Sequence, residues 1–213
     1  DARVVVAEEG KSILPGAYGA DLGALWKPFP SLVLNATLWY LHMDQEFVYV
    51  GDEAIVEAGG KTRRLGVDLG LRWEFLRRFY LQADYTYSHA RSIGEPKGED
   101  YIPLAPVHTF VAGLNYKYKG WTGNLRCRFM GNRPADEDYS LTAKGYWLTD
   151  VNLSYRWKNL TGGVIIENLF DVSWNEAQFA TETRLPDEAE PITEIHFTPG
   201  TPFNARCFVT LQF

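Results

Sequence analysis

Few residues in this sequence have the types and spacing that chemistry on a substrate requires. Ser88 stands beside His89, and a serine with a histidine suggests a nucleophile and its general base. Adjacent residues of a β-strand point to opposite faces, so these two side chains cannot meet if the segment is a strand. The Gly-x-Ser-x-Gly, His-Glu-x-x-His and phosphate-loop motifs do not occur. We therefore expect no catalytic residues and interpret the pair as polar residues near a strand end.

Metal binding is the second chemistry to consider. The candidate ligands are His42, Met43, Asp44, His89, His108 and His196. Metal sites usually space their ligands in short motifs, and the four histidines follow none of them. The 2 cysteines, Cys127 and Cys207, are too few for a cysteine-rich metal site. The sequence predicts no metal or cofactor ligands and leaves the substrate-binding residues unassigned.

Charged residues recur in the middle of segments that otherwise alternate between apolar and polar. They are Asp68, Arg72, Asp84, Arg126, Arg128, Asp150, Arg156 and Arg206. These side chains could contact a substrate, or they could pair with one another, with neighbouring strands or with a plug domain. Charges on a water-filled wall cost little to leave bare, so we favour the second interpretation for most of them.

A long segment before the last strand is acidic. Its charges are Asp171, Glu176, Glu182, Asp187, Glu188, Glu190 and Glu194, against Arg184. Such a segment could attract a cationic ligand by electrostatic steering. It could equally be a solvated loop near the divalent cations of a lipopolysaccharide layer, and the sequence favours neither interpretation.

Composition and charge exclude several classes of protein. The 213 residues suit one domain, and a net charge of −6 argues against nucleic-acid binding, which needs a concentrated basic face. The mean hydropathy is −0.24, and no segment approaches the ~20 consecutive apolar residues of a transmembrane helix. A membrane-spanning strand needs only ~10 residues with every second one apolar, so a membrane location stays open.

The hydrophobic pattern has a period of two, which predicts β-strands. Alternation is clear in 17–27, 64–75, 79–88, 109–118, 121–130, 147–157 and 203–213, and weaker in 32–50 and 161–170. Phe208 is the exception in the last of these segments. We expect an all-β fold of about nine antiparallel up-and-down strands, without a linker or an internal repeat.

Aromatic residues gather at one end of these strands, next to short connections. They are Trp26, Trp73, Phe75, Phe79, Tyr116, Tyr118, Trp121, Tyr155 and Trp157. Because up-and-down strands bring these positions to one level, the pattern indicates the aromatic girdle of a membrane interface. A soluble core has no reason to collect Trp and Tyr in one plane.

The connections alternate between short and long. Short ones are expected at 28–30, 76–78, 119–120 and 158–160, and long ones at about 51–61, 91–106, 131–145 and 171–201. This asymmetry is typical of outer-membrane barrels, which have tight periplasmic turns and long outer loops. Residues 1–15 fall on the long-loop side. Segment 32–50 exceeds a membrane crossing, so its second half should project beyond the bilayer.

The final third of the chain carries motifs that are more specific. The run 145–151 (Gly-Tyr-Trp-Leu-Thr-Asp-Val) begins a strand, and 167–171 (Glu-Asn-Leu-Phe-Asp) ends the next. The run 197–202 (Phe-Thr-Pro-Gly-Thr-Pro) leads into a last strand that ends at Phe213. Together with the upstream segments 18–23, 63–68 and 102–106, these motifs resemble the end of a TonB-dependent outer-membrane receptor, over essentially the whole chain.

The resemblance implies a Gram-negative outer-membrane barrel of about 22 strands, filled by an N-terminal plug. Such receptors take up iron chelates, haem, cobalamin, metals or saccharides, and a short N-terminal box contacts TonB. Residues 1–213 would be the C-terminal portion of the barrel, without plug or box. The chain begins Asp1-Ala2-Arg3, so we expect an N-terminal portion before it. The implied partners are membrane lipid, lipopolysaccharide, and missing strands and plug from the same or a second chain.

Two other classes stay open at this stage. A smaller self-contained outer-membrane barrel, either a pore or a hydrolase, would also alternate, although an odd strand count argues against it. A soluble calyx-type binding protein would place its apolar face inside and its charged face outside. A need for detergent separates the calyx from both membrane classes.

Strand order makes two further expectations specific. Cys127 and Cys207 lie on strands separated by two others, ~14 Å apart at a neighbour spacing of ~4.8 Å, so they should be free thiols. Closure of segment 17–27 onto 203–213 would require parallel pairing in an odd up-and-down run. We therefore expect these two segments to be unpaired edges that need strands from elsewhere.

Overall fold

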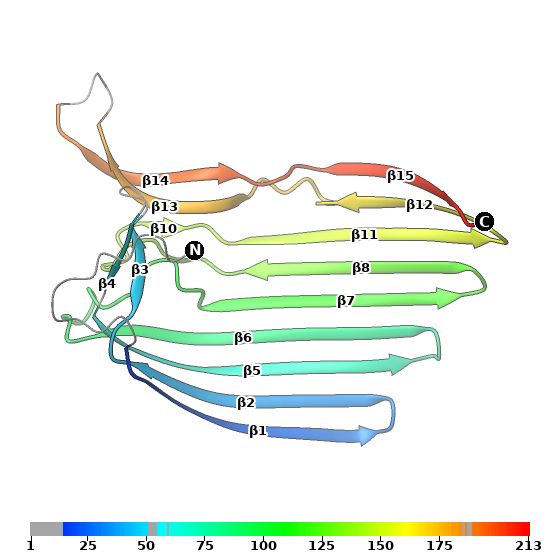
Figure 1. Cartoon of the computed structure of the whole chain (residues 1–213), viewed down its shortest axis with the longest axis horizontal. Coiled ribbons are helices and arrows are strands. Elements are labelled where there is room, and N and C mark those ends of the chain that lie inside the picture. Colours follow the sequence, from blue (N-terminus) through cyan, green and yellow to red (C-terminus); the bar gives the residue numbers. More distant parts are fainter. Residues whose placement is uncertain (1–14, 51–54, 59, 185, 187–188) are drawn as a thin grey trace.

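The computed structural model describes residues 15–50, 55–58, 60–184, 186 and 189–213. Its main element is a nine-stranded sheet in the order β1-β2-β5-β6-β7-β8-β11-β12-β15 (Figure 1). The strands are β1 (Ala17–Phe29), β2 (Leu32–Met43), β5 (Lys61–Phe75), β6 (Phe79–Ile93), β7 (His108–Tyr118), β8 (Trp121–Met130), β11 (Tyr146–Trp157), β12 (Leu160–Glu167) and β15 (Asn204–Leu211). Every neighbouring pair in this sheet is antiparallel, which confirms the predicted topology and strand number.

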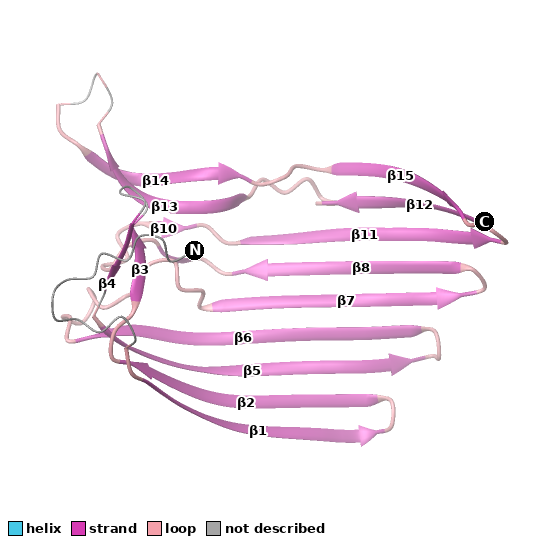
Figure 2. Ribbon diagram, in the orientation of Figure 1, coloured by secondary structure: helices cyan, strands magenta, loops and turns pink. Residues whose placement is uncertain are grey.

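The sheet is open in the part of the chain that the structure describes. β1 and β15 lie at opposite sides of the sheet, and each has one neighbour in it (Figure 1). The expected absence of pairing between the first and last strands therefore holds for the described residues. Figure 2 shows strands and loops throughout. None of the described residues belongs to a helix long and apolar enough to cross a membrane.

Short turns join the strands at one end of the sheet, on the right in Figure 2. They need unusual backbone angles: Leu76 and Arg77 have φ of 51° and 54°, and Lys119 and Gly120 have φ of 44° and 89°. Positive φ at both central residues is the requirement of a type I′ turn, whose twist matches that of the flanking strands. These tight turns hold neighbouring strands in one register.

The long connections at the other end have structure of their own. They contain the hairpins β3 (Phe47–Val50) with β4 (Ile55–Ala58), β9 (Arg133–Pro134) with β10 (Thr142–Ala143), and β13 (Asn175–Thr183) with β14 (Ile192–Pro199). The expected single strand 32–50 is thus wrong, because pairing of β2 with both neighbours ends at Met43. The segment 171–201 was expected to be a loop, but most of it forms β13 and β14. Pairing in the hairpin overrides the weak strand propensity of its many glutamates.

Register assigns every strand residue to one of two faces. One face, here called the apolar face, carries large exposed hydrophobic side chains, among them Leu22, Leu38, Leu69 and Leu153. Across the middle of this face Tyr85, Phe110, Phe129 and Trp147 stand directly opposite one another on adjacent strands. The other face, here called the polar face, carries the charged residues predicted from the sequence. Among the described residues no other element covers this apolar face, and such a face is typical of a barrel wall that contacts lipid.

The aromatic residues predicted as a girdle lie on strand ends beside the short turns, and several of them are in ring contact. Phe75 lies 4.8 Å from Trp73 and 5.3 Å from Phe79 between ring centroids, and Phe79 lies 4.9 Å from Tyr116. Trp121 and Tyr155 form a second group, with ring centroids 4.8 Å apart. The predicted gathering of aromatic residues beside the short turns is thus confirmed, with ring contacts among six of the nine residues.

Both cysteines lie on the apolar face and are free thiols, as predicted. Cys127 is on β8 and Cys207 is on β15, with β11 and β12 between them. Cys127 Sγ lies 3.8 Å from Thr149 Oγ1 on the neighbouring strand.

Glycines on the polar face make room for large side chains from the next strand. A Cβ on Gly66 would lie 2.4 Å from the Trp39 ring, and a Cβ on Gly163 would lie 2.6 Å from the Phe208 ring. Phe208, which breaks the sequence alternation, is thus accommodated because Gly163 stands directly opposite it. The Phe208 ring lies over the backbone of Gly163, where any other residue would present a side chain.

This arrangement predicts different outcomes for two adjacent glycines of β12. Gly163→Ala would place a methyl group 2.8 Å from the Leu153 carbonyl as well as against Phe208, so it should lower the free energy of unfolding by ~1–3 kcal/mol. Gly162→Ala is the matched control, since its nearest neighbour would be 4.0 Å away. Equilibrium unfolding in urea measures both changes, and equal losses would contradict the packing argument.

Candidate functional site

The charges of the polar face are organised as pairs between neighbouring strands. Arg72 donates two hydrogen bonds to the Asp84 carboxylate, at 2.9 and 3.0 Å, and Thr86 donates one to Asp68 at 2.7 Å. The Arg72 and Asp84 side chains are 37% and 55% exposed, so their pairing stabilises the fold by only about 0–1 kcal/mol. These contacts confirm mutual pairing for part of the predicted set.

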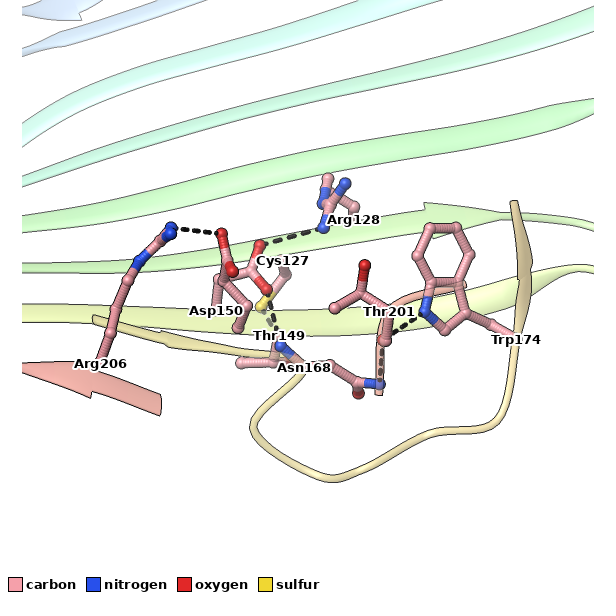
Figure 3. Close-up of polar contacts among 9 residues, drawn as sticks. Cys127, Arg128, Thr149, Asp150, Asn168, Trp174, Thr201 and Arg206 are labelled. Carbon is pink, nitrogen blue, oxygen red and sulfur yellow. Dashed lines mark hydrogen bonds and ion pairs between the residues drawn. The ribbon is translucent and has the colours of Figure 1, made fainter. Parts of the chain in front are cut away.

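A denser network lies where β8, β11, β12 and β15 meet (Figure 3). Asp150 accepts one hydrogen bond from Arg128 Nη2 at 3.2 Å and another from the Asn168 amide at 3.0 Å. Glu167 accepts one from Arg206 Nη2 at 3.0 Å. Asp150 stands directly opposite Arg126, yet its ion pair is with the diagonal Arg128. Arg126 is exposed and makes neither a hydrogen bond nor an ion pair with any described residue.

Asn168 fastens the loop that follows this network. Its side chain donates to the carbonyls of Val172 at 2.9 Å and Thr201 at 3.2 Å, and it accepts from the Val172 amide at 2.9 Å. Asn168 is only 4% exposed and has φ of 50°, a left-handed conformation that asparagine tolerates better than most residues. Asp171 then accepts from the Phe203 amide at 2.9 Å.

Trp174 completes this arrangement, here called the Asn168 clasp. Its indole N–H donates to the Thr201 carbonyl at 3.0 Å, and a Cβ on Gly200 would lie 2.0 Å from its ring (Figure 3). The clasp joins both ends of the β13–β14 hairpin, so the chain returns beside β12 to begin β15. The two motifs that carried the sequence resemblance, 167–171 and 197–202, therefore meet in space and hold the last strand in register.

A hollow of about 660 Å³ lies among the long connections and is here called the outer cleft. Its lining is rich in carboxylates, namely Glu46, Glu95, Glu99, Asp136, Glu137 and Asp138, and includes no lysine or arginine among the described residues. Sequence reasoning pointed instead to the acidic segment before the last strand. Each contributing loop carries its own short acidic run, but only the fold brings these runs together.

A hydrogen bond stabilises the ionised form of one carboxylate of this cleft. The Ser140 amide N–H donates to Asp138 at 2.9 Å and, as the largest cause, holds the pKa of that carboxyl below its usual value. Asp138 therefore keeps its negative charge to a lower pH than an unperturbed aspartate would. Glu46, at the other side, pairs with Arg64 on β5.

The two residues singled out for catalysis are kept apart, and the candidate metal ligands do not gather at one site, although His42 and Asp44 are in contact. Ser88 pairs with Gly66 and His89 with Leu65, so the serine and histidine occupy opposite faces. His42 lies 3.4 Å from Asp44, His108 is 2.8 Å from the Tyr85 hydroxyl, and His196 is 3.5 Å from Glu194. Within the described ranges no three His, Cys, Asp or Glu side chains form a group able to hold a metal ion. Asp187 and Glu188 of the acidic segment lie outside the described residues.

An antiparallel sheet with a bare apolar face, an aromatic girdle and a charged opposite face defines the wall of a transmembrane β-barrel. The model of the family described as TonB dependent receptor-like, beta-barrel, matches residues 16–169. The chain belongs to this family.

Solved structures share the fold at low identity. The ferric yersiniabactin uptake receptor FyuA from Yersinia pestis matches at 15% identity and a TM-score of 0.69, over 92% of this chain and 30% of that one. The ferric citrate transporter FecA matches at 19% identity and 0.70, over 92% and 31%. The ferric-catecholate import receptor Fiu from K12 E. coli matches at 20% and 0.67, over 91% and 27%. The chain thus spans about a third or less of the length of these receptors.

The Asn168 clasp predicts a local effect of mutation. Asn168→Ala removes two donors and one acceptor at a buried site and should lower the free energy of unfolding by ~2–4 kcal/mol, with faster amide exchange in 171–203. Asn159→Ala, which removes one exposed hydrogen bond to Gln212 in a short turn, is the control. Hydrogen-exchange mass spectrometry reports both. Unchanged exchange in 171–203 would show that the clasp does not hold the loop.

Proposed function

We propose that this chain forms part of the wall and outer loops of an outer-membrane transporter that takes up a scarce nutrient with energy from TonB. The observation that carries the proposal is the two-faced sheet of a chain that belongs to the receptor barrel family. The apolar face with its girdle suits lipid, and the paired charges of the polar face suit a water-filled interior that holds a plug.

The open edges support the proposal that further strands complete the barrel. In hydrocarbon each unpaired backbone N–H or C=O costs several kcal/mol, so β1 and β15 cannot both remain bare in a bilayer. We propose that the described sheet is the C-terminal part of a barrel of about 22 strands. Strands from another segment or a second chain pair with β1 and β15, and a plug with its TonB-binding box comes from outside this chain.

The charge of the outer cleft bears on the nutrient. The receptors named above carry ferric yersiniabactin, ferric catecholates or ferric citrate, and the wider range includes haem, cobalamin, other metals and saccharides. A concave surface of one charge sign repels ligands of the same sign. We propose that the substrate is a neutral or cationic nutrient complex, because six carboxylates of the described residues line the outer cleft.

Two other functions have less support. A self-contained pore or hydrolase would need β1 and β15 to pair, and they do not pair in the part of the structure described. A soluble calyx would bury its apolar face, whereas Leu22 and Val209 on that face are both 73% exposed. An enzymatic role also lacks support from the family, which is one of receptors.

The proposal is tested by returning the full-length gene to cells from which it has been deleted. The protein should fractionate with the outer membrane, migrate on gels in a heat-modifiable way, and restore growth on one metal complex or other scarce nutrient. A point variant that breaks the TonB-binding box of the full product should abolish that growth without loss of protein. Recovery of the protein in a soluble fraction without detergent would refute the proposal.

The lipid-facing assignment gives a sharper test with adjacent residues. Leu153→Arg, on the apolar face in mid-strand, should cost ~2–4 kcal/mol of barrel stability. Ser154→Arg adds the same side chain to the polar face one residue away and should cost much less. Urea unfolding of the receptor in lipid vesicles measures both losses of stability. Equal losses would contradict the proposal that the apolar face contacts lipid. Leu69→Arg on β5 repeats the test on a second strand.

A further inference from the structure

Basic side chains interrupt the apolar face near the long-loop end of the sheet. Register places Tyr18, His42, Arg63 and Arg91 in one row across β1, β2, β5 and β6. Lys61 follows on the same face of β5. Below this row the outward residues of β5 are apolar, namely Leu65, Val67, Leu69, Leu71 and Trp73.

The row lies at the height expected for the bilayer boundary opposite the aromatic girdle. Trp73 belongs to the girdle at the short-turn end, and Arg63 lies further along the same strand. With a rise of ~3.3 Å per residue and a barrel strand tilt of ~40°, Arg63 stands ~25 Å above Trp73 along the barrel axis. The apolar band of outer-membrane barrels is itself ~25 Å tall. Arg63 therefore lies at the level of the outer-leaflet headgroups.

The charges in this row are not balanced within the described protein. Arg63 stands directly opposite Arg91, and two like charges in that position destabilise a sheet. Arg91 has its own partners, since Nε lies 3.6 Å from Asp100 and the guanidinium lies 4.1 Å from the Tyr101 ring. Arg63 is exposed and makes neither a hydrogen bond nor an ion pair with any described residue.

The remaining groups of the row leave Arg63 without a counter-charge. The Asp44 carboxylate lies 3.4 Å from His42 and 4.0 Å from Lys61. The Lys61 side chain is 60% exposed, so its ammonium remains open to a further ligand. His42 is 24% exposed and lies 6.0 Å from the Tyr18 ring. An anion seated between Arg63 and Lys61 would complete the row.

We propose that Arg63 and Lys61, flanked by His42, bind the phosphate group of an outer-leaflet lipid on the outside of the barrel. This inference rests on the proposed function, because it needs the apolar face to lie in the outer membrane. An arginine binds phosphate through two parallel hydrogen bonds, and a lysine adds a compact charge that tolerates several geometries. A phosphate also removes the repulsion between Arg63 and Arg91. The lipid's acyl chains would then lie along the apolar residues of β5 below.

The test uses the complete receptor that contains these strands, purified from outer membranes in a mild detergent. Native mass spectrometry measures binding of bisphosphorylated lipid A, of dephosphorylated lipid A and of inorganic phosphate. Arg63→Gln should weaken binding of bisphosphorylated lipid A about fivefold, and the double variant with Lys61→Gln about twentyfold. Arg126→Gln, an exposed and unpaired arginine on the polar face, is the matched control and should leave this binding unchanged.

The outcomes separate this inference from the proposed function. Equal binding of both lipid A forms, or equal losses in the Arg63 and Arg126 variants, would overturn the phosphate site although the receptor is folded in the outer membrane. Inorganic phosphate binding as tightly as the lipid would overturn a lipid as the ligand. A wild-type protein that is absent from the outer membrane would overturn the proposed function, and this inference with it.

Discussion

Satisfaction of backbone hydrogen bonds is the constraint on which the rest of this structure depends. In a lipid environment no water can accept or donate a bond, so each strand must pair along its whole length. Each internal strand of the nine-stranded sheet has a paired neighbour on both sides, whereas β1 and β15 each have one neighbour in the part of the chain that the structure describes. Tight turns with positive φ and glycines beneath Trp39 and Phe208 keep the registers that this pairing requires. The open edges are therefore the feature that most directly connects this chain to a larger barrel.

The two faces of the sheet differ in how much a charged side chain costs there. On the polar face, water is available and charges pair across strands at little net gain, so Arg72 with Asp84 and Arg128 with Asp150 set geometry more than stability. On the apolar face a charge is costly except at the boundaries of the hydrocarbon. The proposed position of Arg63 at such a boundary gives a physical reason for an arginine that has no partner among the described residues, on a strand face that also carries Lys61 and is otherwise apolar.

The long connections are the parts of a barrel that differ most readily between members of one family. At 15–20% identity the solved receptors share the fold of the wall, and the wall follows from alternation that many sequences can satisfy. The outer cleft draws its carboxylates from separate loops, and the β13–β14 hairpin is held by Asn168 and by Gln178, which bonds the Lys144 backbone in both directions. Loop composition, placed by a common scaffold, is where substrate choice can evolve.

Several features were predictable from the sequence because they depend on local periodicity. A period of two assigned the strands, their faces and the girdle, and short connections marked the turns, since neighbours in an up-and-down sheet are neighbours in sequence. The motifs around Asn168 indicated the family, but their clasp was not predictable because residues 168 and 201 meet only after a hairpin forms between them. The same reason made the diagonal pairing of Asp150 with Arg128 and the outer cleft unpredictable. Local sequence determined the wall, whereas contacts between residues distant in the chain, which only register and loop packing bring together, decided the clasp, the charge pairs and the cleft.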